Sequence, residues 1–117
     1  MDYTVLTNLR LTGALKAEGG VSGALTGCVK LSKAADYTLT ADERSTAAVC
    51  AELTAASKAL TLGIAEGQVL FVVNTGSTNA FTLKGRTGDT GTSLGAGKAA
   101  LVIGSETADA TKIYVLN

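Results

Sequence analysis

The second half of the chain is an unbroken succession of short hydrophobic runs separated by turn residues. Between Lys58 and Asn117 each run is rich in Val, Leu, Ile, Thr or an aromatic residue, and each is bounded by Gly, Ser, Asn, Asp or Thr. Runs and boundaries of this kind are typical of β-strands joined by short turns. The chain has no proline, so every strand keeps all its N–H donors for pairing. The sequence therefore predicts one all-β domain, an antiparallel β-sandwich or barrel.

Individual strands can be predicted from these runs. The run from Val69 to Asn74 starts with five consecutive apolar residues, so we expect a central strand with both faces covered. The turn residues at Thr75–Asn79 predict a hairpin that returns the chain into a strand over Phe81–Lys84. A second hairpin is expected between strands over Ala99–Gly104 and Lys112–Leu116.

The segment 34–56 admits two interpretations. Thr40 and Glu43 have the spacing of a capping box, and the alanine-rich run behind them would propagate a helix. The same run also alternates apolar with mostly polar residues, which favours a strand. We expect a short helical turn over 41–44 followed by a strand over about 46–53, and a longer helix is the alternative.

The N-terminal region differs from the rest of the chain in its residue pattern and glycine content. Apolar residues alternate at the start of the chain, which predicts an extended strand, and residues 12–27 form a glycine-rich segment expected to order only against a partner. We therefore divide the chain into an N-terminal strand and arm, residues 1–33, and a β-domain, residues 34–117. Basic side chains outnumber acidic ones in the arm and would steer it toward an acidic surface. The predicted contact residues of this arm are Tyr3, Val5, Leu9, Arg10, Lys16 and Lys30.

Composition restricts the partners. Ten acidic and ten basic residues give a formal net charge of zero, which disfavours a nucleic-acid binder and offers little protection against self-association. With two Phe, three Tyr and no Trp, large core side chains are few, and we expect a homo-oligomer. No apolar run is long enough for a membrane span, and the N-terminus lacks the pattern of a signal peptide.

Residues for catalysis are sparse. The chain has no histidine, its carboxylates are scattered over predicted turns, and its hydroxyls lack an adjacent base. The glycine-rich run Gly95–Ala100 precedes a strand rather than a helix, which argues against a phosphate-binding loop. Cys28 and Cys50 are expected to be buried free thiols, with a disulfide as the alternative. We predict a protein without catalytic residues, metal or cofactor.

Several segments in order resemble head fibre and capsid decoration proteins of tailed bacteriophages. The resemblance covers about two-thirds of the chain, from Ala35 to Asn117. It is carried by the Leu39–Ala41 turn, the strand before Leu53-Thr54, the Leu60–Leu62 strand, the Gly67–Asn74 strand and the Leu94–Lys98 approach to a strand that ends near Gly104.

The resemblance implies a structural virion protein on the outer capsid surface, made in the bacterial host cytoplasm and assembled as a trimer. Its partners would be copies of itself and the major capsid protein, with the N-terminal region attaching to the shell or to neighbouring subunits. Because the chain ends directly after its last predicted strand, without a fibrous shaft, we expect a compact decoration protein or head fibre base. The alternative is a carbohydrate-binding adhesion domain of a phage fibre or spike, which would bind a host-surface glycan on a threonine-rich strand face.

Overall fold

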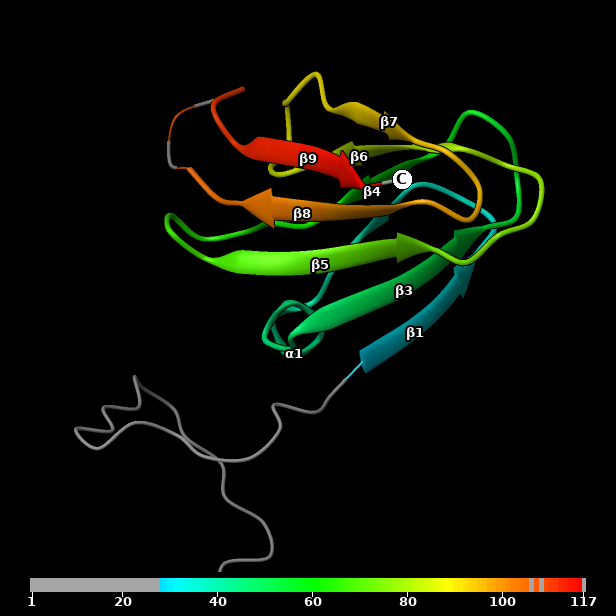
Figure 1. Ribbon diagram of the computed structural model, residues 1–117, viewed down its shortest axis with the longest axis horizontal. Helices are drawn as coiled ribbons and strands as arrows, with labels where there is room; N and C mark the ends of the chain where they lie inside the picture. The colour runs from blue at the N-terminus through cyan, green and yellow to red at the C-terminus, as the bar shows by residue number, and fades with distance from the viewer. Residues whose placement is uncertain (1–27, 106, 108, 117) are drawn as a thin grey trace, which may run out of the picture.

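The computed structural model describes residues 28–105, 107 and 109–116. Within them, two β-sheets pack face to face around one hydrophobic core (Figure 1). The larger sheet has the strand order β1-β3-β5-β8-β9 and the smaller one β2-β4-β6-β7, and neither closes into a barrel. The prediction of an all-β protein is confirmed. The elements are β1 (Cys28–Lys33), β2 (Tyr37–Thr38), α1 (Ala41–Arg44), β3 (Ala48–Leu53), β4 (Ala59–Thr61), β5 (Val69–Asn74), β6 (Phe81–Lys84), β7 (Thr92–Leu94), β8 (Ala99–Ile103) and β9 (Lys112–Leu116).

The first six strands alternate between the two sheets. β1, β3 and β5 lie side by side in the larger sheet, β2, β4 and β6 in the smaller one, and all of these neighbours pair in parallel. The chain therefore winds as a coil in which each turn adds one strand to each sheet. The prediction of an antiparallel sandwich is wrong for these strands, because the turns between them lead across to the opposite sheet instead of back along the same one.

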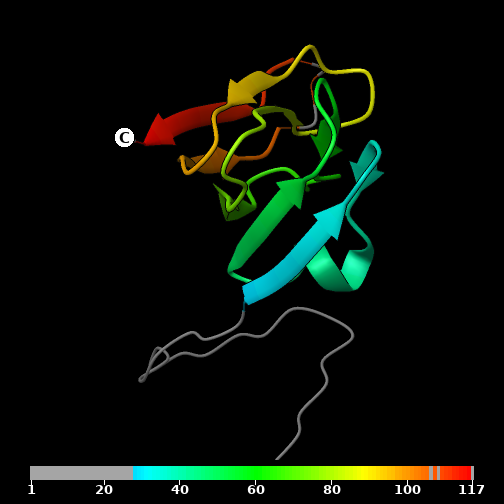
Figure 2. The same ribbon diagram turned by 90° about the vertical axis from the view of Figure 1, so that its right-hand side faces the viewer.

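The last three strands pair antiparallel with their neighbours. β7 pairs with β6, while β8 pairs with β5 and β9 with β8. The predicted hairpin between β8 and β9 is confirmed. Figure 2, turned by 90°, shows β1 and β9 at the two opposite edges of the larger sheet.

The predicted hairpin between β5 and β6 is wrong, because these two strands belong to different sheets. Asn74, fully buried at the end of β5, holds the crossing between them. Its amide nitrogen donates to the carbonyls of Asn79 (2.9 Å) and Leu94 (3.0 Å), and its Oδ1 accepts from the N–H of Gly76 (3.0 Å). The glycine, serine and asparagine residues of this segment therefore build a corner, for which they are as well suited as for a hairpin turn.

The core lies between the sheets and is built from alternate residues of their strands. Side chains along a strand point to opposite faces, so every second residue meets the partner sheet. Most of the buried side chains are Leu or Val, and Phe81 is the one aromatic residue among them in the described part of the chain. The buried hydrophobic residues are Leu39, Val49, Ala51, Leu53, Leu60, Leu62, Ile64, Leu70, Val72, Phe81, Leu83, Leu94, Ala100 and Val102.

The short helix and the strand after it agree with the favoured interpretation of segment 34–56. The Thr40 hydroxyl accepts from the N–H of Glu43 (3.3 Å), and Oε1 of Glu43 accepts from the N–H of Thr40 (2.8 Å), which completes the predicted capping box. The same Oε1 accepts a hydrogen bond from the Tyr37 hydroxyl at 2.7 Å. The helix ends at Arg44 and β3 begins at Ala48, so the alternative of a longer helix is wrong.

Candidate interaction surface

The side of the larger sheet that faces away from the core carries a row of large apolar side chains. Strand register places Phe71 of β5 opposite Leu101 of β8, and Leu101 opposite Tyr114 of β9. Phe71 is 47% exposed and Tyr114 is 53% exposed. We call this surface the outer apolar face, and it consists of Val69, Phe71, Val73, Leu101, Ile103, Tyr114 and Leu116.

This arrangement corrects the prediction that β5 is covered on both sides. Leu70 and Val72 are fully buried against the smaller sheet, whereas Val69 and Phe71 on the other side are about half exposed. An unbroken apolar run in the sequence does not distinguish a strand buried within one chain from a strand whose second face is available to a partner. Contiguous exposed apolar surface of this kind marks interaction sites in folded proteins.

Polarity changes across the larger sheet and between the two sheets. Toward the β1 edge the outward positions become polar, with Glu52 on β3 and Lys30 and Ser32 on β1. The outward residues of the smaller sheet include Thr61, Thr82 and the exposed Ser93. Among the described residues, the exposed large apolar side chains therefore lie on β5 and β9, and the exposed Lys112 of β9 lies on the outer side opposite Ile103.

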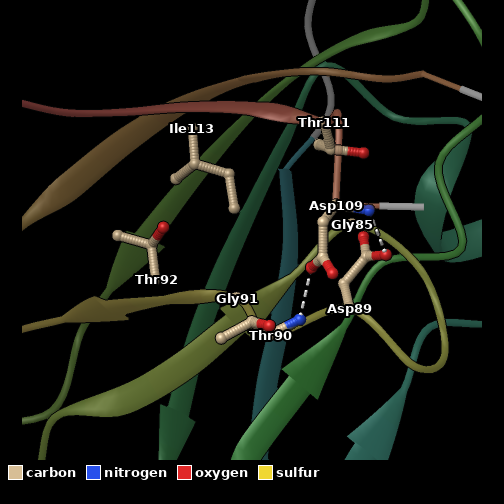
Figure 3. Close-up of a pocket in the computed structure, with 8 residues that line it drawn as sticks. All are labelled: Gly85, Asp89, Thr90, Gly91, Thr92, Asp109, Thr111 and Ile113. Atoms are coloured by element: carbon tan, nitrogen blue, oxygen red, sulfur yellow. Dashed lines mark hydrogen bonds between the residues drawn. The ribbon is translucent and has the colours of Figure 1, made fainter. Parts of the chain in front are cut away.

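A hollow of about 370 Å³ lies between the loop that joins β6 to β7 and the loop that joins β8 to β9 (Figure 3). Asp89, only 4% exposed, accepts hydrogen bonds from the N–H groups of Arg86 and Asp109, both at 3.0 Å. Asp109 in turn accepts from the N–H of Thr90 at 2.6 Å. Both carboxylates are thus engaged by backbone donors, and the arrangement joins the two loops to each other.

The two aspartates of this hollow connect its loops through hydrogen bonds from backbone N–H groups. Its lining comprises the two aspartates, threonines, glycines and Ile113, with no cysteine or basic side chain that could act with a carboxylate. Thr111 contributes the buried Oγ1, which lacks a hydrogen-bond partner among the described residues. The outer apolar face is therefore the candidate interaction surface among the described residues.

Most of the predicted contact residues lie outside the described part of the chain. Tyr3, Val5, Leu9, Arg10 and Lys16 belong to residues 1–27, so the predicted N-terminal strand and arm stay predictions. Lys30 is exposed on β1, and the segment 28–33 that was assigned to the arm forms the edge strand of the larger sheet. The predicted contact residues did not include Phe71 or Tyr114, because the apolar runs that contain them do not show which side chains stay exposed.

The prediction that both cysteines are buried is wrong. Cys28 is exposed at the start of β1, and Cys50 is half-buried on β3. Both are free thiols, and their sulfur atoms lie 2.7 Å apart.

Among residues 28–105, 107 and 109–116, no cluster of three or more His, Cys, Asp or Glu side chains is placed to hold a metal ion. Within the same residues, no helix has the length and apolar character needed to cross a bilayer.

Comparison with known protein families, curated proteins and solved structures finds no match for the chain.

Proposed function

We propose that the protein is a non-catalytic structural component of a tailed-phage virion, a decoration protein or head fibre base that assembles on the outer capsid surface. The observation that carries the proposal is the outer apolar face. The sequence resemblance to head fibre and capsid decoration proteins supports the same function. Covering large side chains such as Phe71 and Tyr114, which are about half exposed on the larger sheet, with a partner would stabilise the protein.

The partner that best fits this face is another copy of the chain. A formal net charge of zero leaves little electrostatic repulsion between copies. β9, the last strand of the larger sheet among the described residues, presents Tyr114 and Leu116 on its outer side, and Val115 on the opposite side is 40% exposed. A strand that is apolar on both sides suits the centre of a ring, where it contacts one neighbour on each side. Closed rings form from such heterologous contacts, and the proposed ring is a trimer.

The test compares one introduced charge on each of two sheet faces. Tyr114→Glu places a carboxylate on the outer apolar face, and Ser93→Glu places one on the polar face of the smaller sheet. We expect light scattering to give a trimer for the wild type and for Ser93→Glu, and an 11.7 kDa monomer for Tyr114→Glu. A wild type that stays monomeric at micromolar concentration would refute assembly through this face.

The capsid part of the proposal needs a separate measurement. The wild type and Ser93→Glu should co-sediment with capsids that lack the protein, and Tyr114→Glu should bind them much more weakly because it loses the avidity of three linked attachment points. If the trimer forms but does not bind such capsids, the assembly surface is correct and the virion function is wrong.

A carbohydrate-binding adhesion domain is the second candidate. It is favoured by the exposure of two aromatic rings, Phe71 and Tyr114, in the same cross-strand row of the outer apolar face. Sugars stack on exposed aromatic rings, but the neighbours in this row are aliphatic and offer no hydrogen-bonding groups to hydroxyls. A glycan array distinguishes the candidates: reproducible binding of one sugar family, lost in Tyr114→Glu, would favour adhesion over decoration.

A further inference from the structure

Cys28 and Cys50 form a contact that neither the core nor the outer apolar face requires. Their sulfur atoms are 2.7 Å apart, although the two residues are separated by 22 positions in the sequence. A disulfide bond has a length of about 2.05 Å, so only a small movement separates the two thiols from bonding distance. The chain contains no other cysteine, so each thiol has one partner within the same molecule.

The sheet explains why the two thiols meet. β1 and β3 pair in parallel, with Cys28 opposite Ala48 and Lys30 opposite Cys50. Because the two cysteines are one diagonal step apart on the same outward side, both side chains project from the larger sheet in the same direction. Cys28 is the first residue of β1, and β3 is the neighbour of β1 in the larger sheet.

The surroundings favour thiol chemistry over metal binding. A structural metal site needs about four ligands, and no third His, Cys, Asp or Glu lies near enough to the pair among the described residues. Hydrogen bonding with Cys28 and partial burial raise the pKa of the Cys50 thiol. Cys28 is the exposed member of the pair, so it is the sulfur that a reagent from solution reaches first.

We propose that Cys28 and Cys50 are a reversible dithiol–disulfide pair that locks β1 onto β3 under oxidising conditions. The oxidant is a low-molecular-weight disulfide such as oxidised glutathione. The Cys28 thiolate attacks one of its sulfurs, which breaks that S–S bond, forms a mixed disulfide and releases one small thiol. The Cys50 thiolate then attacks the Cys28 sulfur and releases the second small thiol. Two protein thiols lose two protons and two electrons, and the small disulfide gains them.

The bond would act on the strand through which residues 1–27 connect to the domain. β1 lies at the edge of the larger sheet, and β3 is its neighbour there. In a reducing cytoplasm the thiols stay free, and outside it the bond closes the loop between the two residues. Closing a loop restricts the unfolded chain, so the oxidised protein should resist unfolding more than the reduced one. This inference does not depend on the proposed virion function.

The test uses the full chain, reduced and then incubated with oxidised glutathione. We expect a protein that has lost two hydrogen atoms in mass, that no longer reacts with iodoacetamide and that gives one peptide pair joining residues 28 and 50. The melting temperature should rise by about 10 °C or more and return to its initial value with dithiothreitol. Cys28→Ser, at an exposed position, should fold normally and show none of these changes.

Three results would overturn the proposal. The first is oxidation that yields only dimers linked between molecules, and the second is a protein that stops at the glutathione mixed disulfide. The third is an intramolecular bond that leaves the melting temperature unchanged, because such a bond would not lock β1 in place. If Cys28→Ser shows the same rise with oxidised glutathione as the wild type, the stabilisation has another cause and the proposal fails.

Discussion

Truncation of the two phenylalanines, one on each sheet, should lower the free energy of unfolding by very different amounts. Phe81 on β6 is 2% exposed between the two sheets, whereas Phe71 on β5 is 47% exposed on the outer apolar face. We compare Phe81→Ala with Phe71→Ala, which remove the same atoms. The pair therefore separates the stability of the folded chain from the stability that a partner adds.

The expected magnitudes follow from the exposure of each ring. Removing a fully buried phenylalanine ring costs about 3–5 kcal/mol, because apolar contacts are lost and a cavity remains. Phe71 has only about half of its surface covered within the chain, so its truncation should cost about 1–2 kcal/mol in the isolated protomer. A domain of this size has a free energy of unfolding of roughly 5–15 kcal/mol, so only Phe81→Ala threatens the fold itself.

Urea unfolding followed by circular dichroism, at low and at high micromolar protein concentration, distinguishes the two effects. Assembly stabilises the wild type by mass action, so its midpoint should rise with concentration. Phe81→Ala should lower the midpoint at both concentrations, and Phe71→Ala should abolish most of the concentration dependence. If Phe71→Ala is as destabilising as Phe81→Ala at the low concentration, Phe71 is covered within the chain and the outer apolar face does not exist.

Three further outcomes are expected. Gly104→Ala should lower the free energy of unfolding by about 3 kcal/mol, because a Cβ there collides with the backbone carbonyl of Ala65. Gly95→Ala is the control: its Cβ would meet only the flexible side chain of a lysine, so the free energy of unfolding should change by at most about 0.5 kcal/mol. Equal melting temperatures for the two variants would contradict the packing at Gly104. Burial by itself would raise the pKa of Glu43, but hydrogen bonds from the Thr40 backbone and the Tyr37 hydroxyl lower it overall. Its stabilising contribution is therefore complete above the unfolded pKa of about 4.3 and is lost as the pH falls through the lower folded pKa, so Glu43→Gln should flatten the acid limb of a plot of melting temperature against pH. Deleting residues 1–27 should leave the β-domain folded, as judged by a cooperative unfolding transition followed by circular dichroism, because β1 to β9 lie within residues 28–116. The deletion should abolish capsid attachment; decoration at wild-type occupancy would place the attachment surface within residues 28–117.

The sequence by itself determined the local structure of the described residues well. Short apolar runs and the turn residues around them predicted β-strands where β5, β6, β8 and β9 lie, because these signals come from residues close together in the chain. The capping box at Thr40 and Glu43 is equally local and placed α1 correctly. The hairpin between β8 and β9 was predictable because these two strands follow one another in the chain and pair directly in the same sheet.

Only the tertiary structure decided which strands are neighbours and which faces are covered. A turn residue shows that the chain changes direction, but Asn74 and its partners direct it from β5 into the other sheet, where β6 pairs in parallel with β4. The apolar run of β5 has two suitable faces, and the smaller sheet covers only the one with Leu70 and Val72. Cys28 and Cys50 meet because β1 and β3 pair side by side. Pairing and burial depend on residues far apart in the chain, and the periodicity of one strand contains no information about its partner.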